Sequence, residues 1–200
     1  MKRLRATSSY CKCSTWIYYE TIEVIYVFER KIIVELTTDL KNMGFCLSDM
    51  NETDLDDFLR VDRLTFQRYI TEFPDYFGDR YKPEIGTACF YEKRKLAFFK
   101  KLILNGETVG FMNYDQKDDR IDDISIRIIK KAQNRGIGTL FVLHLMELSK
   151  KFCIPVYIEA IKTNPVQNLY KRLGFEFYEP DDKYKKDIQD YCCFIVYNPQ

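Results

Sequence analysis

The sequence predicts an α+β fold built on a mixed, mostly antiparallel β-sheet. The dipeptide Asn105-Gly106, a strong signal for a tight hairpin turn, lies between two strand-like runs. A third strand-like run, residues 120–129, follows directly. A glycine-containing loop and an apolar helical run then lead to the β-branched run 154–162, and a strand–helix–strand unit of this kind places its two strands parallel. With the remaining strand-like runs, the sheet should contain six to seven strands.

The length and composition are those of a globular protein with one domain, or with one domain and an appendage. The chain has 200 residues, of which 46% are apolar and 30% charged, so it can bury a substantial core. The formal net charge is only +1, and we therefore expect no nucleic-acid partner. Charges interrupt every apolar run before it reaches the ~18 residues that span a bilayer, so no membrane segment is expected either.

The N-terminal region carries few functional signals. The basic start "MKRLRATSSYCKC" has no apolar core behind it, so we do not interpret it as a secretion signal and expect a cytoplasmic protein. Cys11 and Cys13 lack a second pair of ligands, so no metal site is expected. The other five cysteines are interpreted mostly as buried, reduced thiols. Residues 15–36 favour strand over helix because they are rich in Tyr, Val and Ile.

The middle of the chain predicts one amphipathic helix followed by a loop. Asn51 or Thr53 can cap the helix, and acidic residues crowd its first turn. The apolar residues on its inner face are Leu55, Phe58, Leu59, Phe66, Tyr69 and Ile70. Residues 71–86, "TEFPDYFGDRYKPEIG", contain four Pro or Gly residues, which indicates a loop with a short helical turn.

The second half of the chain predicts two helices set between strands. Residues 138–151 are apolar almost all round, which indicates a well-buried helix. A short helix follows, with Asn164 as its cap, Pro165 at its first position and Gly174 just past its end. The runs "FEFYEP" and "YCCFIVYN" complete the sheet as two further strands.

The segment "QNRGIGT", residues 133–139, places two glycines at the start of the long helix. Backbone amides at a helix N-terminus bind anions, phosphate above all, and glycine lets the anion approach closely. Three cations flank the loop: Lys130, Lys131 and Arg135. A tight turn without a ligand would also explain the glycines. A dinucleotide fold is excluded because position 141 is Phe rather than the third glycine, and a P-loop because Gly138 is followed by Thr-Leu.

Two blocks of the sequence resemble one known family. "QNRGIGT" is similar to the Q/R-x-x-G-x-G/A pyrophosphate loop of the GCN5-related N-acetyltransferases, the GNAT family. "NPVQNLYKRLGF" resembles the N…LY…LGF segment of that family, in the compact spacing of some bacterial members. The blocks stand in the family's order, and the resemblance covers roughly residues 44–198. It departs from the pattern at Lys130, where the family often has proline.

The resemblance implies a three-layer acyl-CoA N-acyltransferase fold at residues 43–200, with a twisted sheet and helices on both faces. Residues 1–42 form an extension without a counterpart in the minimal family domain. This extension is an added β element, a dimerisation arm or an upstream segment, and the sequence does not decide among the three.

The same resemblance implies that acetyl-CoA is the co-substrate, and no metal is expected. The loop amides would hold the pyrophosphate, and the strand backbone before the loop would hold the pantetheine arm. A bulge near Ile128 would separate the strands that flank this arm, and a bulge amide would polarise the thioester carbonyl. The implied cofactor-binding residues are Ile126, Arg127, Ile128, Gln133, Asn134, Arg135, Gly136, Ile137, Gly138, Thr139 and Asn164.

The implied catalytic residues are Tyr170 and Glu159. Tyr170 matches the tyrosine that protonates the departing thiolate in many family members, although a core aromatic would occupy the same helical stripe. Glu159 is the first candidate for the base that deprotonates the amine, with Asp122 and Asp123 as alternatives. The single histidine, His144, lies in the middle of the apolar helix and is interpreted as structural.

The predicted activity is that of an acyltransferase: transfer of an acetyl group to a primary amine of a small molecule or protein, by direct attack in a ternary complex. The alternative is a non-catalytic acyl-CoA-binding or regulatory module with the same fold. A relative that acetylates charged tRNA is disfavoured by the near-neutral charge. Candidates for the acceptor site are Tyr69, Phe73, Asp75, Tyr76 and Asp79. The acceptor itself and the oligomeric state, a homodimer included, stay open.

Overall fold

The structure is a computed structural model that describes residues 34–78, 82–181 and 188–200. The chain divides into two compact units, Met1–Lys31 and Ile32–Gln200, and the described residues belong to the second. In chain order, its elements are α1 (Thr38–Asn42), β1 (Phe45–Asp49), η1 (Glu52–Asp54), α2 (Leu55–Glu72), α3 (Pro74–Phe77), α4 (Pro83–Lys93), β2 (Phe98–Leu104), β3 (Glu107–Gln116), β4 (Ile121–Ile128), η3 (Lys130–Ala132), α5 (Ile137–Phe152), β5 (Val156–Ile161), α6 (Gln167–Arg172), β6 (Glu176–Phe177) and β7 (Cys192–Tyr197).

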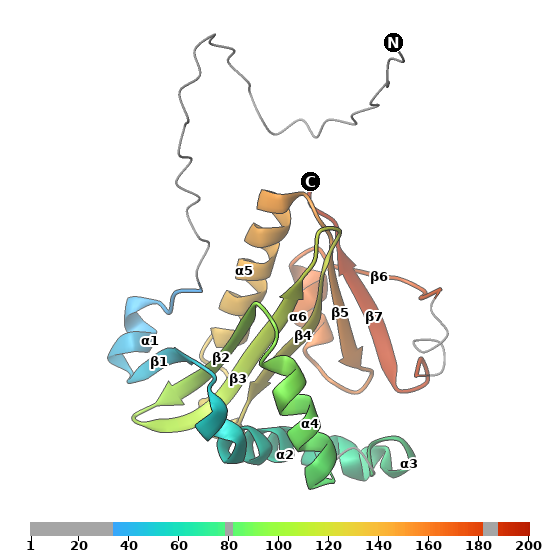
Figure 1. Ribbon diagram of the computed structural model, residues 1–200. Coiled ribbons are helices and arrows are strands. Elements are labelled where there is room, and N and C mark those ends of the chain that lie inside the picture. The colour runs from blue at the N-terminus through green and yellow to red at the C-terminus, as the bar shows by residue number, and fades with distance from the viewer. Residues whose placement is uncertain (1–33, 79–81, 182–187) are drawn as a thin grey trace, which may run out of the picture. The chain divides into compact units, whose positions relative to one another are not determined.

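Seven strands form one mixed sheet in the order β1-β2-β3-β4-β5-β7-β6. Every neighbouring pair is antiparallel except β4 and β5, which run parallel. Helices α2 and α4 cover one face of the sheet and α5 covers the other (Figure 1). The predicted α+β class, with a mostly antiparallel sheet and helices on both faces, is confirmed.

The hairpin between β2 and β3 forms where the sequence predicts it. Asn105 and Gly106 both have positive φ, 50° and 85°, as a two-residue hairpin turn requires. Leu104 pairs with Glu107 across this turn, and after a register shift between Leu102 and Ile103 the pairing runs to Phe98 with Tyr114. The turn chemistry of two residues therefore sets the pairing of the strand ends next to it.

Apolar side chains pack on both faces of the sheet. On one face, Phe58 of α2 lies 4.7 Å from the Phe111 ring of β3 and 5.3 Å from the Phe90 ring of α4, measured between centroids. On the other, Phe141 of α5 is fully buried against the strands. Val34, Leu36 and Leu40, which belong to the predicted extension, contribute to the same core.

Two predictions for the first half of the chain are wrong. Residues 83–86 were expected in a loop, but they begin α4, because Pro83 suits the first position of a helix. Gly86 is a packing residue: a Cβ there would lie 2.6 Å from Leu59 of α2. The first described strand is β1, which was not predicted, whereas residues 34–36 are not strand. Most of the predicted strand at 15–36 lies outside the described residues.

Three predictions for helices and cysteines also need correction. Helix α5 is not buried all round, since its apolar residues Leu143 and Phe152 are 44% and 40% exposed. Helix α6 begins at Gln167 rather than at Pro165, while Gly174 ends the turn with a φ of 85°, as predicted. The thiols are less buried than expected: all five described cysteines are free, and the exposed ones are Cys46, Cys89 and Cys153.

Candidate functional site

The glycine loop leads from β4 into α5 through two left-handed backbone positions. Asn134 has a φ of 60° and Gly136 a φ of 80°, and α5 begins at the next residue. Left-handed backbone favours glycine, so the turn itself explains Gly136. Gly138 lies within the first turn of α5, where helical geometry does not require a glycine. The second glycine therefore needs another reason.

The space beside both glycines is open. A Cβ at Gly136 or at Gly138 would meet no atom within 4 Å. In the described structure no side chain caps α5, so its first amides lack hydrogen-bond partners within the helix. Lys130 and Arg135 are exposed next to these amides. Open space, outward-pointing amides and nearby cations together suit a pyrophosphate group.

The loop is held in place by contacts on its other side. The Gln133 Nε2 atom donates a hydrogen bond to the Ile128 carbonyl at 2.8 Å. Ala132 is 1% exposed, and Lys131 forms an ion pair with Glu107 of β3. Gln133, predicted to bind the cofactor, therefore shapes the loop through its side chain.

Strands β4 and β5 separate next to the loop. They pair at one position only, Ile121 with Val156, and Figure 1 shows them diverging from there. Along residues 126–128 one edge of β4 pairs with β3, while the edge toward β5 has no strand partner. This open edge suits an extended chain that bears hydrogen-bonding groups, as predicted for the pantetheine arm.

The β-bulge lies earlier in β4 than predicted. The pairs that flank it are Asn113 with Ser125 and Asp115 with Asp122, so β4 has one extra residue between them. Asp123 is left-handed at this point, with a φ of 45°. Near Ile128 the pairing is regular, because Gly110 of β3 lets the two backbones approach: a Cβ there would lie 2.5 Å from the Arg127 carbonyl oxygen. The prediction of a bulge near Ile128 is therefore wrong.

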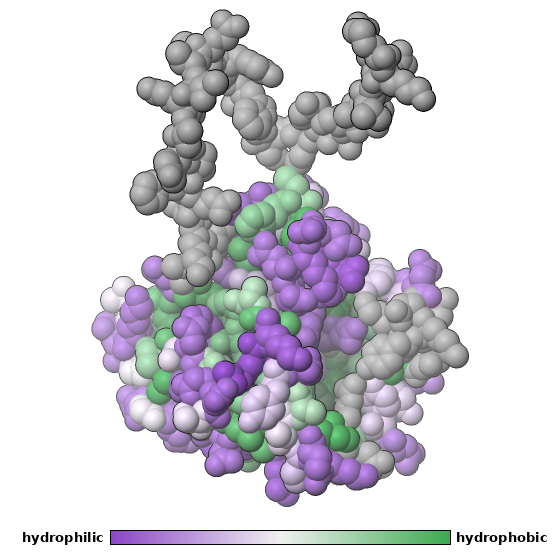
Figure 2. All heavy atoms as spheres, in the orientation of Figure 1, coloured by the Kyte–Doolittle hydropathy of each residue, from purple (hydrophilic) through white to green (hydrophobic). Residues whose placement is uncertain are grey.

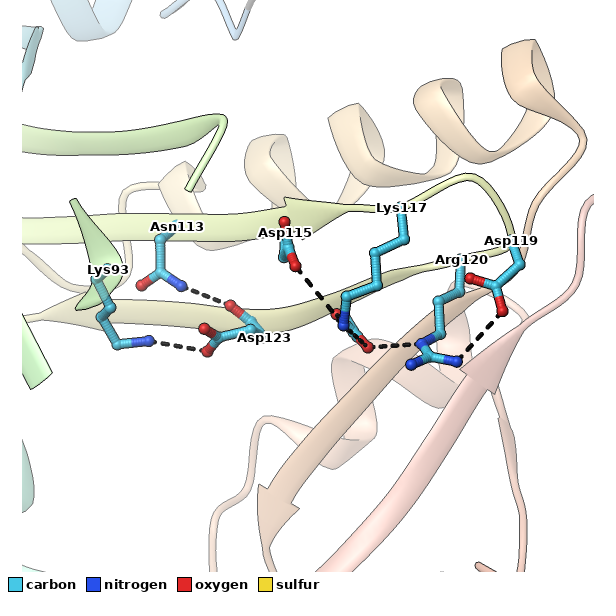
Figure 3. Close-up of polar contacts among 8 residues, drawn as sticks. Lys93, Asn113, Asp115, Lys117, Asp119, Arg120 and Asp123 are labelled. Atoms are coloured by element: carbon cyan, nitrogen blue, oxygen red, sulfur yellow. Dashed lines mark hydrogen bonds and ion pairs between the residues drawn. The ribbon is translucent and has the colours of Figure 1, made fainter. Parts of the chain in front are cut away.

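Asp123, the bulge residue, is held at both its backbone and its side chain (Figure 3). The fully buried Asn113 of β3 donates from Nδ2 to the Asp123 carbonyl. Lys93 of α4 donates to the Asp123 carboxylate at 2.9 Å. Two elements distant in sequence thus fix the conformation of the bulge.

A cavity of about 600 Å³ opens on the α2 and α4 side of β4 and β5. Apolar (green) surface lies in a hollow next to hydrophilic (purple) surface in Figure 2. The apolar lining includes Phe58, Phe66, Phe77, Phe111, Ile124 and Ile161. The charged lining comprises Asp62, Lys93, Lys117, Asp122, Asp123, Arg127 and Glu159. An apolar cavity with a few charged groups is the usual form of a small-ligand site.

Tyr170 lies in α6 and is 5% exposed, with its ring 5.6 Å from the Phe175 ring. Burial raises the pKa of the Tyr170 phenol to about 12, while the charge of Arg127 acts in the opposite direction. The phenol is thus neutral and a proton donor throughout the physiological range. Tyr170 is not among the residues that line the cavity.

The three candidate bases line the same cavity. Asp122 is engaged by Lys117 at 2.8 Å and by Arg120 at 2.7 Å, and Asp123 by Lys93 (Figure 3). These ion pairs occupy the two aspartates. Glu159 is an exposed residue on β5, where it pairs in register with Phe194 of β7.

Asn164, predicted to bind the cofactor, and His144, predicted to be structural, do not line this cavity. Asn164 accepts a hydrogen bond from the Val166 amide at 3.0 Å, which supports the turn into α6. His144 is buried, with Nε2 3.3 Å from the Tyr114 hydroxyl. Burial lowers the pKa of His144 to about 4, so the ring is neutral at pH 7.

The cavity and the residues predicted for the acceptor site are largely different sets. The cavity lining includes Phe66 and Phe77 but not Tyr69, Phe73, Asp75 or Tyr76; Asp79 lies outside the described residues. Tyr76 instead stacks on Tyr191, with ring centroids 4.5 Å apart. The side chain of Arg127 was also missed, because the prediction assigned a role only to its backbone. The alternation along residues 120–129 carried a signal, since it places Arg127 on the face opposite Ile126 and Ile128.

A model of the acetyltransferase (GNAT) family matches residues 59–175, which include the bulge, the loop and α6. The chain belongs to the GNAT acetyltransferase family. An N-alpha-acetyltransferase of Sulfurisphaera tokodaii is 24% identical over 172 residues, which cover 78% of this chain and 95% of that protein.

Solved GNAT-like structures share the fold. The PaiA N-acetyltransferase of Thermoplasma acidophilum, in complex with coenzyme A, has a TM-score of 0.58 at 13% identity, covering 78% of this chain and 99% of that chain. Arabidopsis thaliana Naa50, in complex with the bisubstrate analogue CoA-Ac-MVNAL, has a TM-score of 0.52 at 17% identity, covering 76% and 97%.

Two further kinds of site, for a metal ion and for a membrane, are absent from the described residues. No cluster of three or more His, Cys, Asp or Glu side chains in this part of the GNAT domain is arranged to hold a metal ion. No helix in the same residues combines the length and the apolar character needed to cross a membrane.

Proposed function

We propose that this GNAT protein transfers the acetyl group of acetyl-CoA to a primary amine by direct attack in a ternary complex. The observation that carries the proposal is that two different sites lie next to the same strand, β4. The anion-type loop follows the end of β4, and the charged cavity opens on the α2 face of β4 and β5. A donor and an acceptor held there would meet where the two strands separate.

Binding of the donor falls to the backbone. When bound, acetyl-CoA supplies an activated acyl group as a thioester. The amides of residues 134–139 hold its pyrophosphate, with Gly136 and Gly138 leaving room for it. The open edge of residues 126–128 orients the pantetheine arm, and a backbone amide at the Asp123 bulge polarises the carbonyl.

Proton transfer falls to side chains. Glu159 takes a proton from the acceptor amine, since an amine must be neutral to attack. Tyr170 gives a proton to the leaving sulfur, and its buried phenol stays protonated up to high pH. Cys89 and Cys192 also line the cavity, but desolvation by the surrounding protein raises the pKa of the Cys89 thiol, although the residue as a whole is exposed, and keeps it a weak nucleophile. Direct attack is therefore favoured over an acyl-cysteine route.

The acceptor class we favour is an α-amine at a peptide or protein N-terminus. The name of the Sulfurisphaera tokodaii relative and the peptide analogue bound to Naa50 support this choice. A small-molecule amine fits the same chemistry and belongs in the test.

The decisive experiment measures thiol release from acetyl-CoA with a panel of α-amine peptides, lysine peptides and small amines. We expect turnover with at least one amine. Double-reciprocal plots of initial velocity against acetyl-CoA, at several amine concentrations, should give intersecting lines, as a ternary complex requires. CoA binding without turnover on any amine would instead establish the non-catalytic module. Parallel lines in the double-reciprocal plot, together with loss of activity in Cys89→Ala or Cys192→Ala, would indicate an acyl-enzyme intermediate in place of direct attack.

A further inference from the structure

Arg127 presents a rigid guanidinium group to the cavity. Residues at this position of β4 face α2, and Arg127 Cζ lies 3.7 Å from the centroid of the Phe66 ring. The side chain is 27% exposed. Stacking on an aromatic face fixes the plane of a guanidinium and leaves its N–H groups pointing along that plane.

Arg127 forms a long ion pair with Asp62, but its Nε donor has no hydrogen-bond partner among the described residues. Its nearest carboxylate oxygen, Asp62 Oδ1, is 3.7 Å from Nε, which is too far for a hydrogen bond. The Nε atom is buried and makes no hydrogen bond within the described part of the chain. Buried donors of this kind nearly always find an acceptor in a working complex.

The other two cations that line the cavity behave differently. Lys93 donates to Asp123 at 2.9 Å, and Lys117 donates to Asp122 at 2.8 Å. Both lysines are therefore occupied by hydrogen-bonded carboxylates. Arg127 is the cavity cation, among the described residues, with hydrogen-bonding capacity left for a ligand oxygen.

We propose that Arg127 binds a carbonyl or carboxylate oxygen that neighbours the acceptor amine, so that the acceptor is an α-amino carbonyl compound. This inference rests on the proposed function and deepens it. Arg127 lines the same cavity as Glu159, the proposed base, so the guanidinium faces the space in which the acceptor amine would bind. A planar guanidinium matches planar oxygen groups. A simple alkylamine or a lysine side chain has no such oxygen beside its nitrogen.

The charge of the cavity fits a small acceptor of this kind. The lining carries three cations and four acidic residues: Asp62, Asp122, Asp123 and Glu159. The lining therefore does not attract a large anion. An acceptor that carries its amine and its oxygen on adjacent atoms can place the amine toward Glu159 and the oxygen toward Arg127. Free amino acids and peptide N-termini share this chemistry.

The test compares three acceptors of similar shape: alanine, alaninamide and 2-butylamine. For Arg127→Gln we expect kcat/KM to fall about 10- to 100-fold with alaninamide, alanine or both, mainly through KM, because one charged hydrogen bond is lost. With 2-butylamine the change should stay below about 3-fold. Arg127→Lys should restore part of the loss, and the KM of acetyl-CoA should not change.

Arg94→Gln is the matched control. Arg94 is also 27% exposed, pairs with Glu52 at 3.0 Å and lies 5.9 Å from the Phe90 ring, but it does not line the cavity. We expect this variant to behave like the parent protein with every acceptor. Thermal melting of each variant separates a loss of folding from a loss of recognition.

The outcomes discriminate clearly. Selective loss with alaninamide identifies a peptide N-terminus as the source of the oxygen, and selective loss with alanine a free amino acid. An equal loss with all three acceptors, or no loss, overturns the inference while acetyl transfer itself stands. If no amine is acetylated, calorimetry of alaninamide and 2-butylamine on the CoA complex replaces kinetics. The proposed function then fails, and Arg127-dependent binding of alaninamide alone would still support the inference.

Discussion

The proposed donor loop and the proposed acceptor cavity of this GNAT protein are built in different ways. The loop is one continuous segment, Ile129–Gly138, and its predicted ligand contacts are backbone amides. The cavity is lined by side chains drawn from positions 58 to 192, on helices α2, α3 and α4 and strands β3, β4, β5 and β7. One site depends on local conformation, and the other exists only after the chain has folded.

This difference explains which site the sequence could reveal. A backbone site needs glycines and a helix start at fixed spacing, so it leaves a short and readable pattern. A side-chain site needs only that suitable groups meet in space, which no local pattern records. Family membership accordingly predicts which donor binds, whereas the class of acceptor has to be inferred from the residues that line the cavity.

The largest effect is expected from a change at the donor loop that leaves the fold intact. Gly138→Asp places a side chain and a negative charge in the open space beside the first turn of α5. We expect CoA affinity to fall at least ~100-fold, or ~2.7 kcal/mol, because the carboxylate occupies and repels the anion site. Calorimetry with CoA measures this loss.

Gly138 is a better probe than Gly136, whose φ of 80° would strain any side chain. An acidic residue near a helix N-terminus is tolerated or stabilising, so the melting temperature should not drop. Gly78→Asp, at another open glycine with a φ of −57°, serves as the control for CoA binding. Normal CoA affinity in Gly138→Asp would remove the pyrophosphate from this loop.

A change of the proposed proton donor should leave both binding sites intact. Tyr170→Phe keeps the buried ring and removes the hydroxyl. We expect kcat to fall about 100-fold, the usual scale for a general acid, with unchanged CoA affinity. Because the pKa of Tyr170 is about 12, deprotonation of this group should cause no fall in the pH–rate profile of the parent protein below about pH 10. An unchanged kcat would assign Tyr170 to packing alone.

A change at the bulge tests the junction between the two sites. Asn113→Asp keeps the shape of the side chain but turns a donor toward the Asp123 carbonyl into an acceptor. We expect kcat to fall about 10-fold and the free energy of unfolding by ~1–3 kcal/mol. Steady-state kinetics and urea unfolding provide the two readouts. Lys93→Met, which loses only the side-chain contact, should have the smaller effect; the reverse order would show that Asn113 does not position the bulge.

The smallest effect on activity is expected from His144, which is buried in α5 and has no role in the proposed reaction. Its pKa is about 4 in the folded protein against an ordinary value of 6.5, so the unfolded chain binds the proton first as pH falls. Its contribution to stability is present above pH 6.5 and is lost as pH falls through about 4. Urea unfolding of His144→Gln should therefore show a flatter pH dependence in this window, by ~1–3 kcal/mol. An unchanged slope would contradict the assignment.

The parts of the fold that local chemistry determines were predictable from the sequence. Asn105-Gly106 and Gly174 mark turns through their left-handed backbone, and both lie where expected. Gly86 was misread as a loop residue, because its role is to let α2 approach α4, a contact between elements distant in sequence. The position of the bulge depends on the pairing of β3 with β4 and on Asn113 and Lys93, so no local signal located it.

The candidate site divides in the same way. The loop residues and the neighbourhood of Glu159 with Asp122 and Asp123 follow from the order of the strands. The unsatisfied guanidinium of Arg127 does not, since it depends on Phe66 and Asp62 of α2.

One NMR titration tests most directly whether the backbone binds the donor while side chains bind the acceptor. The chain has only eight glycines, so their amide signals can be assigned and followed. CoA should shift the signals of Gly136 and Gly138, whereas pantetheine, which lacks the pyrophosphate, should leave them in place. Alaninamide added to the CoA complex should then shift the Arg127 side-chain signal and not those of the two glycines. Unmoved glycine signals at saturating CoA would contradict the assignment of the donor site.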